Sequence, residues 1–139
     1  MIKVAIIGLG IMGRRMLQHM RIHEKFEPNY LWDPDENACQ KAIEIDSEAK
    51  IMTSPEEAID AADLVYLACP PQVREAHAIQ AAQKGKALFL EKPLGIEIDD
   101  SRLLIDKLKD FNVPLAVNFT QAAGTALNDL IKAKSDGEL

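Results

Sequence analysis

The feature that most constrains this chain is a group of three closely spaced glycines near its N-terminus. Residues 8–13 read Gly-Leu-Gly-Ile-Met-Gly, which fits the pattern GxGxxG. An apolar stretch with the length of a buried strand, Ile2–Ile7, comes directly before it, and an amphipathic stretch with helical periodicity, Ile11–His23, overlaps its end. A GxGxxG turn between a strand and a helix is typical of folds that bind a dinucleotide.

Each glycine has a separate role in that interpretation. Gly8 permits the tight turn, Gly10 has no Cβ to obstruct a pyrophosphate, and Gly13 lets the helix pack close to the strand. The start of the helix, with Ile11 and Met12, offers unpaired N–H groups and a positive dipole end to phosphate oxygens. We therefore predict that all five residues belong to a cofactor site. The alternative is a glycine turn that binds no ligand.

An acidic residue follows at the spacing that such folds use. Asp33 ends a short second strand, Tyr30–Trp32, about 20 residues after the last glycine. Its carboxylate can accept hydrogen bonds from both adenosine ribose hydroxyls and would repel a 2′-phosphate, which favours NAD over NADP as the cofactor. Asp33 could also cap a helix that begins at Pro34, and the two roles are compatible.

The remaining sequence continues the alternation of strands and helices. We expect further strands at Lys50–Thr53, Asp63–Cys69, Ala87–Leu90 and Pro114–Phe119, and helices at Pro34–Ile45, after a Ser54 cap, at Pro71–Lys84, at Asp99–Phe111 and at 122–134, the last with Leu127, Leu130 and Ile131 facing inward. This order predicts an α/β, doubly wound Rossmann fold. Its six-stranded, mostly parallel sheet has the strand order 3-2-1-4-5-6 and helices on both faces. The length of 139 residues suits one domain, 1–139.

Composition excludes several classes of partner. A net charge of −6 argues against nucleic acid, because phosphate backbones require a basic face. No apolar run approaches the roughly 18 residues of a membrane span. Cys39 and Cys69 are too few for a disulfide framework, so we expect reduced thiols and a cytoplasmic protein. No spacing of Cys and His indicates a metal site.

Later segments resemble the Gfo/Idh/MocA family of oxidoreductases. Residues 91–94 read Glu-Lys-Pro-Leu straight after the fifth strand and are preceded by Gly-Lys at 85–86, like the family's Glu-Lys-Pro signature. Residues 69–71 stand where the family has Thr-Pro-x, residues 117–119 fit its sixth strand, and residues 135–139 resemble its Ser-Gly-Glu-Leu-Gly. The resemblance covers essentially the whole chain. It departs from the pattern at Arg74, where many members carry His, and at 122–123, where many have Arg-Phe.

The resemblance implies an NAD-dependent dehydrogenase that transfers a hydride between nicotinamide and a sugar, inositol or related polyol. Lys92 would be the catalytic residue, beside the nicotinamide and the substrate hydroxyl, and Glu91 would orient Lys92 or the backbone. Pro93 would fix the turn, through a cis bond in our hypothesis. Cys69, Pro70 and Pro71 would line the nicotinamide side, and Asn118 would also contact the cofactor.

The resemblance also implies that part of the enzyme lies outside this chain. Family members take their general base from a second α/β domain, which also mediates oligomerisation, and we expect the full-length protein to be a homo-oligomer. His19, His23 and His77 are expected to be ordinary surface or helix residues. The chain alone should bind NAD without turnover. Two alternatives remain, a stand-alone NAD-binding sensor or regulatory module, and the N-terminal domain of a β-hydroxyacid dehydrogenase, which the Glu-Lys-Pro segment disfavours.

Overall fold

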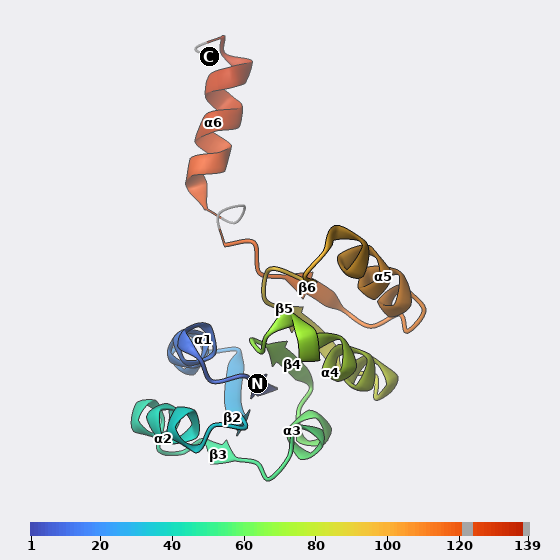
Figure 1. Cartoon of the computed structure of the whole chain (residues 1–139). Helices are drawn as coiled ribbons and strands as arrows, with labels where there is room; N and C mark the ends of the chain where they lie inside the picture. Colours follow the sequence, from blue (N-terminus) through green and yellow to red (C-terminus); the bar gives the residue numbers. More distant parts are fainter. Residues whose placement is uncertain (121–123, 138–139) are drawn as a thin grey trace.

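A computed structural model of the chain describes residues 1–120 and 124–137, and its centre is one parallel sheet (Figure 1). The strands are β1 (Ile2–Ile7), β2 (Phe26–Trp32), β3 (Lys50–Ile51), β4 (Leu64–Leu67), β5 (Ala87–Leu90) and β6 (Leu115–Val117). They lie in the order β3-β2-β1-β4-β5-β6, and every neighbouring pair is parallel. The helices are α1 (Ile11–Arg21), α2 (Glu36–Ile45), α3 (Pro55–Ala61), α4 (Pro71–Gln83), α5 (Ile98–Lys109) and α6 (Thr125–Ser135). The expected fold class and strand order are confirmed.

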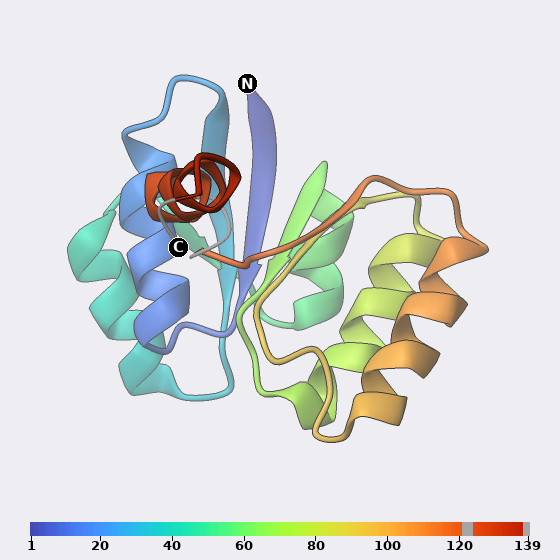
Figure 2. The ribbon, with the colours of Figure 1, turned by 90° about the horizontal axis from the view of Figure 1, so that it is seen from above.

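Helices cover the sheet on both faces, α1 and α2 on one side and α3, α4 and α5 on the other (Figure 2). Residues 4–7 of β1 are apolar without interruption because their side chains are buried on both faces of the sheet. Val4 and Ile6 pack with the α1 and α2 side chains, whereas Ala5 and Ile7 pack with those of α3, α4 and α5. All four side chains are fully buried, as expected of a central strand in a parallel sheet.

Two element boundaries near β2 differ from the sequence prediction. β2 begins at Phe26 rather than Tyr30, because a register irregularity opposite Lys3–Ala5 accommodates Pro28, which cannot donate a ladder hydrogen bond. α2 begins at Glu36, and its cap is Asp35, whose side chain accepts a hydrogen bond from the Asn37 amide at 2.9 Å. The alternative that Asp33 caps this helix is therefore wrong, and its carboxylate instead accepts from the Leu9 and Asp35 amides.

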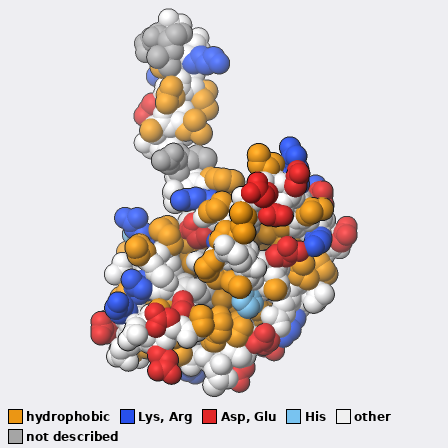
Figure 3. Space-filling view, viewed as in Figure 1, with side chains coloured by type: hydrophobic (Ala, Val, Ile, Leu, Met, Phe, Trp, Pro, Cys, Tyr) orange, Lys and Arg blue, Asp and Glu red, His pale blue; other side chains and the backbone are white. Residues whose placement is uncertain are grey.

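The last helix also differs from expectation. Leu127, Leu130 and Ile131 are 42%, 58% and 59% exposed, so the expected inward orientation was wrong, and α6 has no buried residue. Figure 1 shows α6 projecting from the rest of the domain, and Figure 3 shows hydrophobic side chains on its surface. The part of this helix expected at 122–123 lies outside the described residues. No helix of the described chain is long and apolar enough to cross a membrane.

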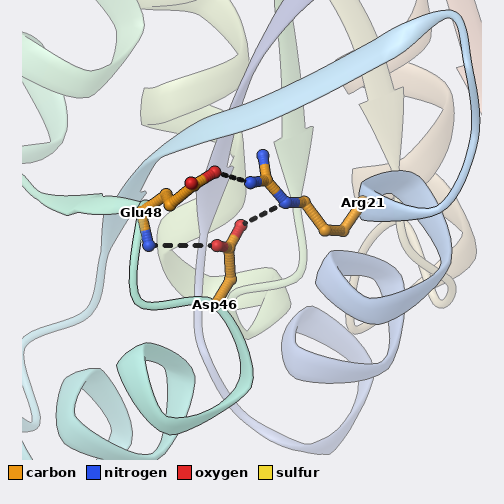
Figure 4. A network of polar contacts seen from close by, with 3 residues as sticks. All are labelled: Arg21, Asp46 and Glu48. Atoms are coloured by element: carbon orange, nitrogen blue, oxygen red, sulfur yellow. Dashed lines mark hydrogen bonds and ion pairs between the residues drawn. The ribbon is translucent and has the colours of Figure 1, made fainter.

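An ion-pair network lies at the end of the sheet opposite the carboxyl ends of the strands (Figure 4). Arg21, at the end of α1, pairs with Asp46 (Nε to Oδ2, 3.3 Å) and with Glu48. The Glu48 amide donates to Asp46 Oδ1 at 3.1 Å. The network joins the end of α1 to the turn between α2 and β3.

The packing predicts unequal effects for two leucine truncations. Leu108→Ala should lower the free energy of unfolding by about 2–5 kcal/mol, because Leu108 is 2% exposed in the core beneath α5. Leu130→Ala on α6 should change it by less than about 0.5 kcal/mol. Chemical denaturation of both variants measures the difference. Equal losses would show that α6 packs against the domain in solution.

Candidate cofactor-binding site

A cavity of about 540 Å³ lies at the carboxyl ends of β1, β2, β4 and β5. Four segments line it: the glycine turn (Gly8, Gly10, Met12), the end of β2 (Trp32, Asp33, Pro34), the β4–α4 connection and α4 (Ala68, Cys69, Pro70, Pro71, Val73, Arg74, His77), and the segment after β5 (Glu91, Lys92, Pro93). Its volume is in the range of small-molecule and cofactor sites.

Most residues that the sequence singled out line this cavity together: Gly8, Gly10, Met12, Asp33, Cys69, Pro70, Pro71, Glu91 and Lys92. Three others do not. Ile11 is 78% exposed at the start of α1, Gly13 is buried beneath Gly8, and the buried Asn118 side chain contacts Glu91.

The three glycines of the turn meet different constraints. Gly8 has a positive φ of 95°, and a Cβ there would lie 2.5 Å from the Cys69 amide nitrogen. A Cβ on Gly13 would lie 1.9 Å from the Gly8 carbonyl oxygen. Gly10 has an ordinary φ of −63°, and a Cβ there would meet nothing within 4 Å. The fold itself therefore requires glycine at positions 8 and 13, but not at position 10.

The surroundings of Gly10 fit an anionic ligand that approaches the backbone closely. Gly10 is exposed, lines the cavity and is the N-cap of α1, with no side chain to satisfy the first amides of that helix. Unpaired amides at a helix N-terminus bind phosphate oxygens. The pyrophosphate of a dinucleotide therefore fits the chemistry of this turn.

Asp33 is fixed against the same turn. Its Oδ2 accepts a hydrogen bond from the Leu9 amide at 2.6 Å, and its Oδ1 accepts one from the Asp35 amide at 2.8 Å. A carboxylate has about four lone-pair sites, so both oxygens retain capacity for hydroxyl donors. The arrangement fits a ribose whose hydroxyls lie beside the glycine turn.

Glu91 organises the other end of the cavity from a buried position. Its Oε1 accepts hydrogen bonds from the Tyr66 hydroxyl at 2.5 Å and from Asn118 Nδ2, and its Oε2 accepts one from the Lys92 amide at 3.2 Å. Burial and the neighbouring carboxylate raise the pKa of Tyr66, which keeps the phenol a donor. The Lys92–Pro93 peptide is cis, as our hypothesis required, and the Lys92 side chain is exposed at the cavity.

Sequence reasoning missed the importance of Arg74. Its side chain is buried, and its guanidinium donates to the carbonyls of Cys69, Glu91 and Pro93. Burial lowers the pKa of Arg74, an effect that Cys69 and Glu91 oppose. Helical periodicity could have indicated that Arg74 is buried, because it lies on the same face of α4 as Ala78 and Ala81.

His77 was also missed as a cavity residue. Its ring meets Trp32 nearly edge-on, with centroids 6.1 Å apart, at the β2 end of the cavity. Burial lowers the pKa of His77 more than Glu56 raises it, which favours the neutral imidazole.

Cys69 is a wall residue of the cavity rather than a reactive group. Burial raises the pKa of its thiol, which keeps the thiol protonated and unreactive. Within residues 1–120 and 124–137, no cluster of His, Cys, Asp and Glu could hold a metal ion.

Comparison with known proteins agrees with this geometry. An oxidoreductase of Streptococcus pneumoniae is 35% identical to this chain over 115 residues, which cover 81% of this chain and 30% of that protein. Inositol 2-dehydrogenase of Corynebacterium glutamicum is 27% identical over 143 residues, covering 99% and 42% of the two chains. The chain thus spans less than half the length of these relatives.

Solved structures share the fold. The scyllo-inositol dehydrogenase of Lactobacillus casei, solved with NAD(H) and scyllo-inositol, superposes with a TM-score of 0.86 at 16% identity, covering 99% of this chain and 42% of that one. The myo-inositol 2-dehydrogenase of Lactobacillus plantarum superposes with a TM-score of 0.85 at 23% identity, covering 99% and 42%.

Fold and site together define a dinucleotide-binding α/β domain of the oxidoreductase class. The family model described as "Oxidoreductase family, NAD-binding Rossmann fold" matches residues 2–119, and this chain belongs to that family, Gfo/Idh/MocA. The same match argues against the alternative of a β-hydroxyacid dehydrogenase.

Proposed function

We propose that this chain binds NAD in the 540 Å³ cavity and forms the cofactor half of a dehydrogenase that acts on a sugar, inositol or related polyol. The observation that carries the proposal is the open space around Gly10. No packing contact within the fold requires glycine at this position. A pyrophosphate that lies against the backbone would require it. The inositol dehydrogenases among the relatives support the substrate class.

The adenosine end of the cofactor lies at Asp33 in this proposal. The fixed carboxylate accepts hydrogen bonds from the ribose hydroxyls and repels a 2′-phosphate, so NAD is preferred over NADP. Trp32 and His77 form the wall of the cavity on this side.

The nicotinamide end lies at Lys92. The bound cofactor supplies the hydride chemistry. The Lys92 ammonium, exposed at the cavity beside the fixed Glu91, donates a hydrogen bond to the reacting substrate oxygen and stabilises negative charge that develops there. Lys92 is thus the residue to which we assign a catalytic role.

We assign proton abstraction and the floor of the substrate site to a further domain. His77 packs against Trp32 at the β2 end of the cavity, while His19 and His23 line a separate apolar groove beside α1. Because we assign the general base to that further domain, as the family resemblance implies, the 139-residue chain should bind NAD and not oxidise polyols. We further propose that the whole protein is cytoplasmic, since Cys39 and Cys69 are free thiols, and that it is a homo-oligomer, as the family resemblance suggests.

A single methyl group tests the cofactor site. Gly10→Ala should change the free energy of unfolding by less than about 1 kcal/mol, because the added Cβ meets open space. It should weaken NADH binding by about tenfold or more, since the methyl occupies the space of the pyrophosphate. Fluorescence titration with NADH and chemical denaturation measure the two effects.

Gly13→Ala is the matched control for the stability measurement on Gly10→Ala. Its Cβ would clash with the Gly8 carbonyl oxygen, so this variant should lose about 1–3 kcal/mol of stability. Wild-type NADH affinity in Gly10→Ala would refute the proposed site.

Cofactor preference follows from the Asp33 carboxylate. Calorimetric titration of the wild-type chain should give tighter binding of NADH than of NADPH. Asp33→Asn should reduce that preference by about tenfold, because the amide no longer repels a 2′-phosphate. Asp35→Asn should leave the preference unchanged, since Asp35 caps α2 and Asn is an equally good cap. A wild-type chain that prefers NADPH would contradict the assignment.

A further inference from the structure

We propose that Arg74 is a positioning residue for the nicotinamide end of the site, which fixes the backbone on both sides of Lys92. The inference rests on the proposed function. It concerns a residue that the sequence comparison with the family marked only as a departure.

The geometry of the Arg74 side chain is the first argument. The residue is 2% exposed. Nη1 donates to the Glu91 carbonyl at 2.5 Å and to the Pro93 carbonyl, and Nη2 donates to the Cys69 carbonyl at 2.5 Å. Glu91 and Pro93 are the two chain neighbours of Lys92, and Cys69 belongs to the connection between β4 and α4. One planar group therefore joins the two loops that flank this end of the cavity.

The cost of this arrangement is the second argument. Within the described chain Arg74 has no ion pair, and the nearby Glu91 carboxylate accepts from Tyr66, Asn118 and the Lys92 amide instead. Among the described residues the hydrogen-bond acceptors of Arg74 are all backbone carbonyls, and its buried Nε has no partner. An apolar side chain of similar volume would fill the same space at lower cost, so packing alone does not explain a cation here. Its five donors in a rigid fork do explain it, because they can hold three acceptors at once.

The consequence for Lys92 is the third argument. Arg74 holds the carbonyls before and after Lys92, while the Glu91 carboxylate holds the Lys92 amide. With the backbone fixed on both sides, only the rotamers of the exposed Lys92 side chain remain free. Arg74 makes no hydrogen bond to the glycine turn or to Asp33. Its loss should therefore disturb the nicotinamide end and spare the adenosine end.

The test compares two ligands that differ at the nicotinamide end. NADH and ADP-ribose share the adenosine and pyrophosphate, but ADP-ribose has no nicotinamide. We expect the wild-type 139-residue chain to bind NADH more tightly than ADP-ribose. Arg74→Met and Arg74→Lys should each weaken NADH binding by about tenfold and ADP-ribose binding by less than about twofold. Arg74→Lys keeps the charge but cannot form the three-carbonyl bridge.

Leu108→Ala is the control for a general loss of stability, because Leu108 is a buried core residue in the last turn of α5, at the end of that helix remote along the chain from the segment after β5. It should lower the melting temperature and keep the wild-type ratio of the two affinities. If Arg74→Met does not fold, Arg74→Lys decides. Equal weakening of both ligands, an unchanged ratio in Arg74→Lys, or a wild-type chain that binds both ligands equally would overturn the positioning role. A wild-type chain that binds neither ligand would instead refute the proposed function.

Discussion

The hydrogen bond from the Leu9 amide to the Asp33 carboxylate joins the two segments on which the site depends. The Gly8 amide donates to the Trp32 carbonyl at 2.9 Å beside it, so the glycine turn and the end of β2 are held together by backbone and side chain alike. The second Asp33 oxygen accepts from the Asp35 amide and fixes the carboxylate. Turn, carboxylate and start of α1 therefore form one rigid unit, and the parallel register of β1 and β2 brings it to one edge of the sheet.

The opposite end of the cavity is held by buried polar side chains instead of glycines. Glu91, Arg74 and Asn118 are three of the four buried polar or charged residues in the described chain, and they lie together at the carboxyl ends of the strands. Burying them costs free energy that an apolar core would not; their hydrogen bonds offset part of that cost, and the buried Nε of Arg74 has no partner among the described residues. The buried polar interactions of this end of the cavity thus gather around the backbone of Lys92, to which we assign a catalytic role.

Local patterns in the sequence predicted the parts of this structure that depend on local chemistry. The glycine spacing and the acidic end of β2 predicted the turn and its neighbour, and alternating apolar runs predicted the order of strands, because the handedness of crossovers leaves few topologies. The contacts of Arg74 were not predictable, since they involve backbone carbonyls from two distant loops. The exposure of Leu130 was missed because periodicity identifies an apolar helix face but not whether another element covers it.

A crystal structure of the chain with NADH tests the central claim most directly. We predict that the pyrophosphate lies against Gly10, that both adenosine ribose hydroxyls bond to Asp33, and that the nicotinamide lies beside Lys92. A structure in which the cofactor lies elsewhere, with Asp33 still bonded only to Leu9 and Asp35, would contradict the account.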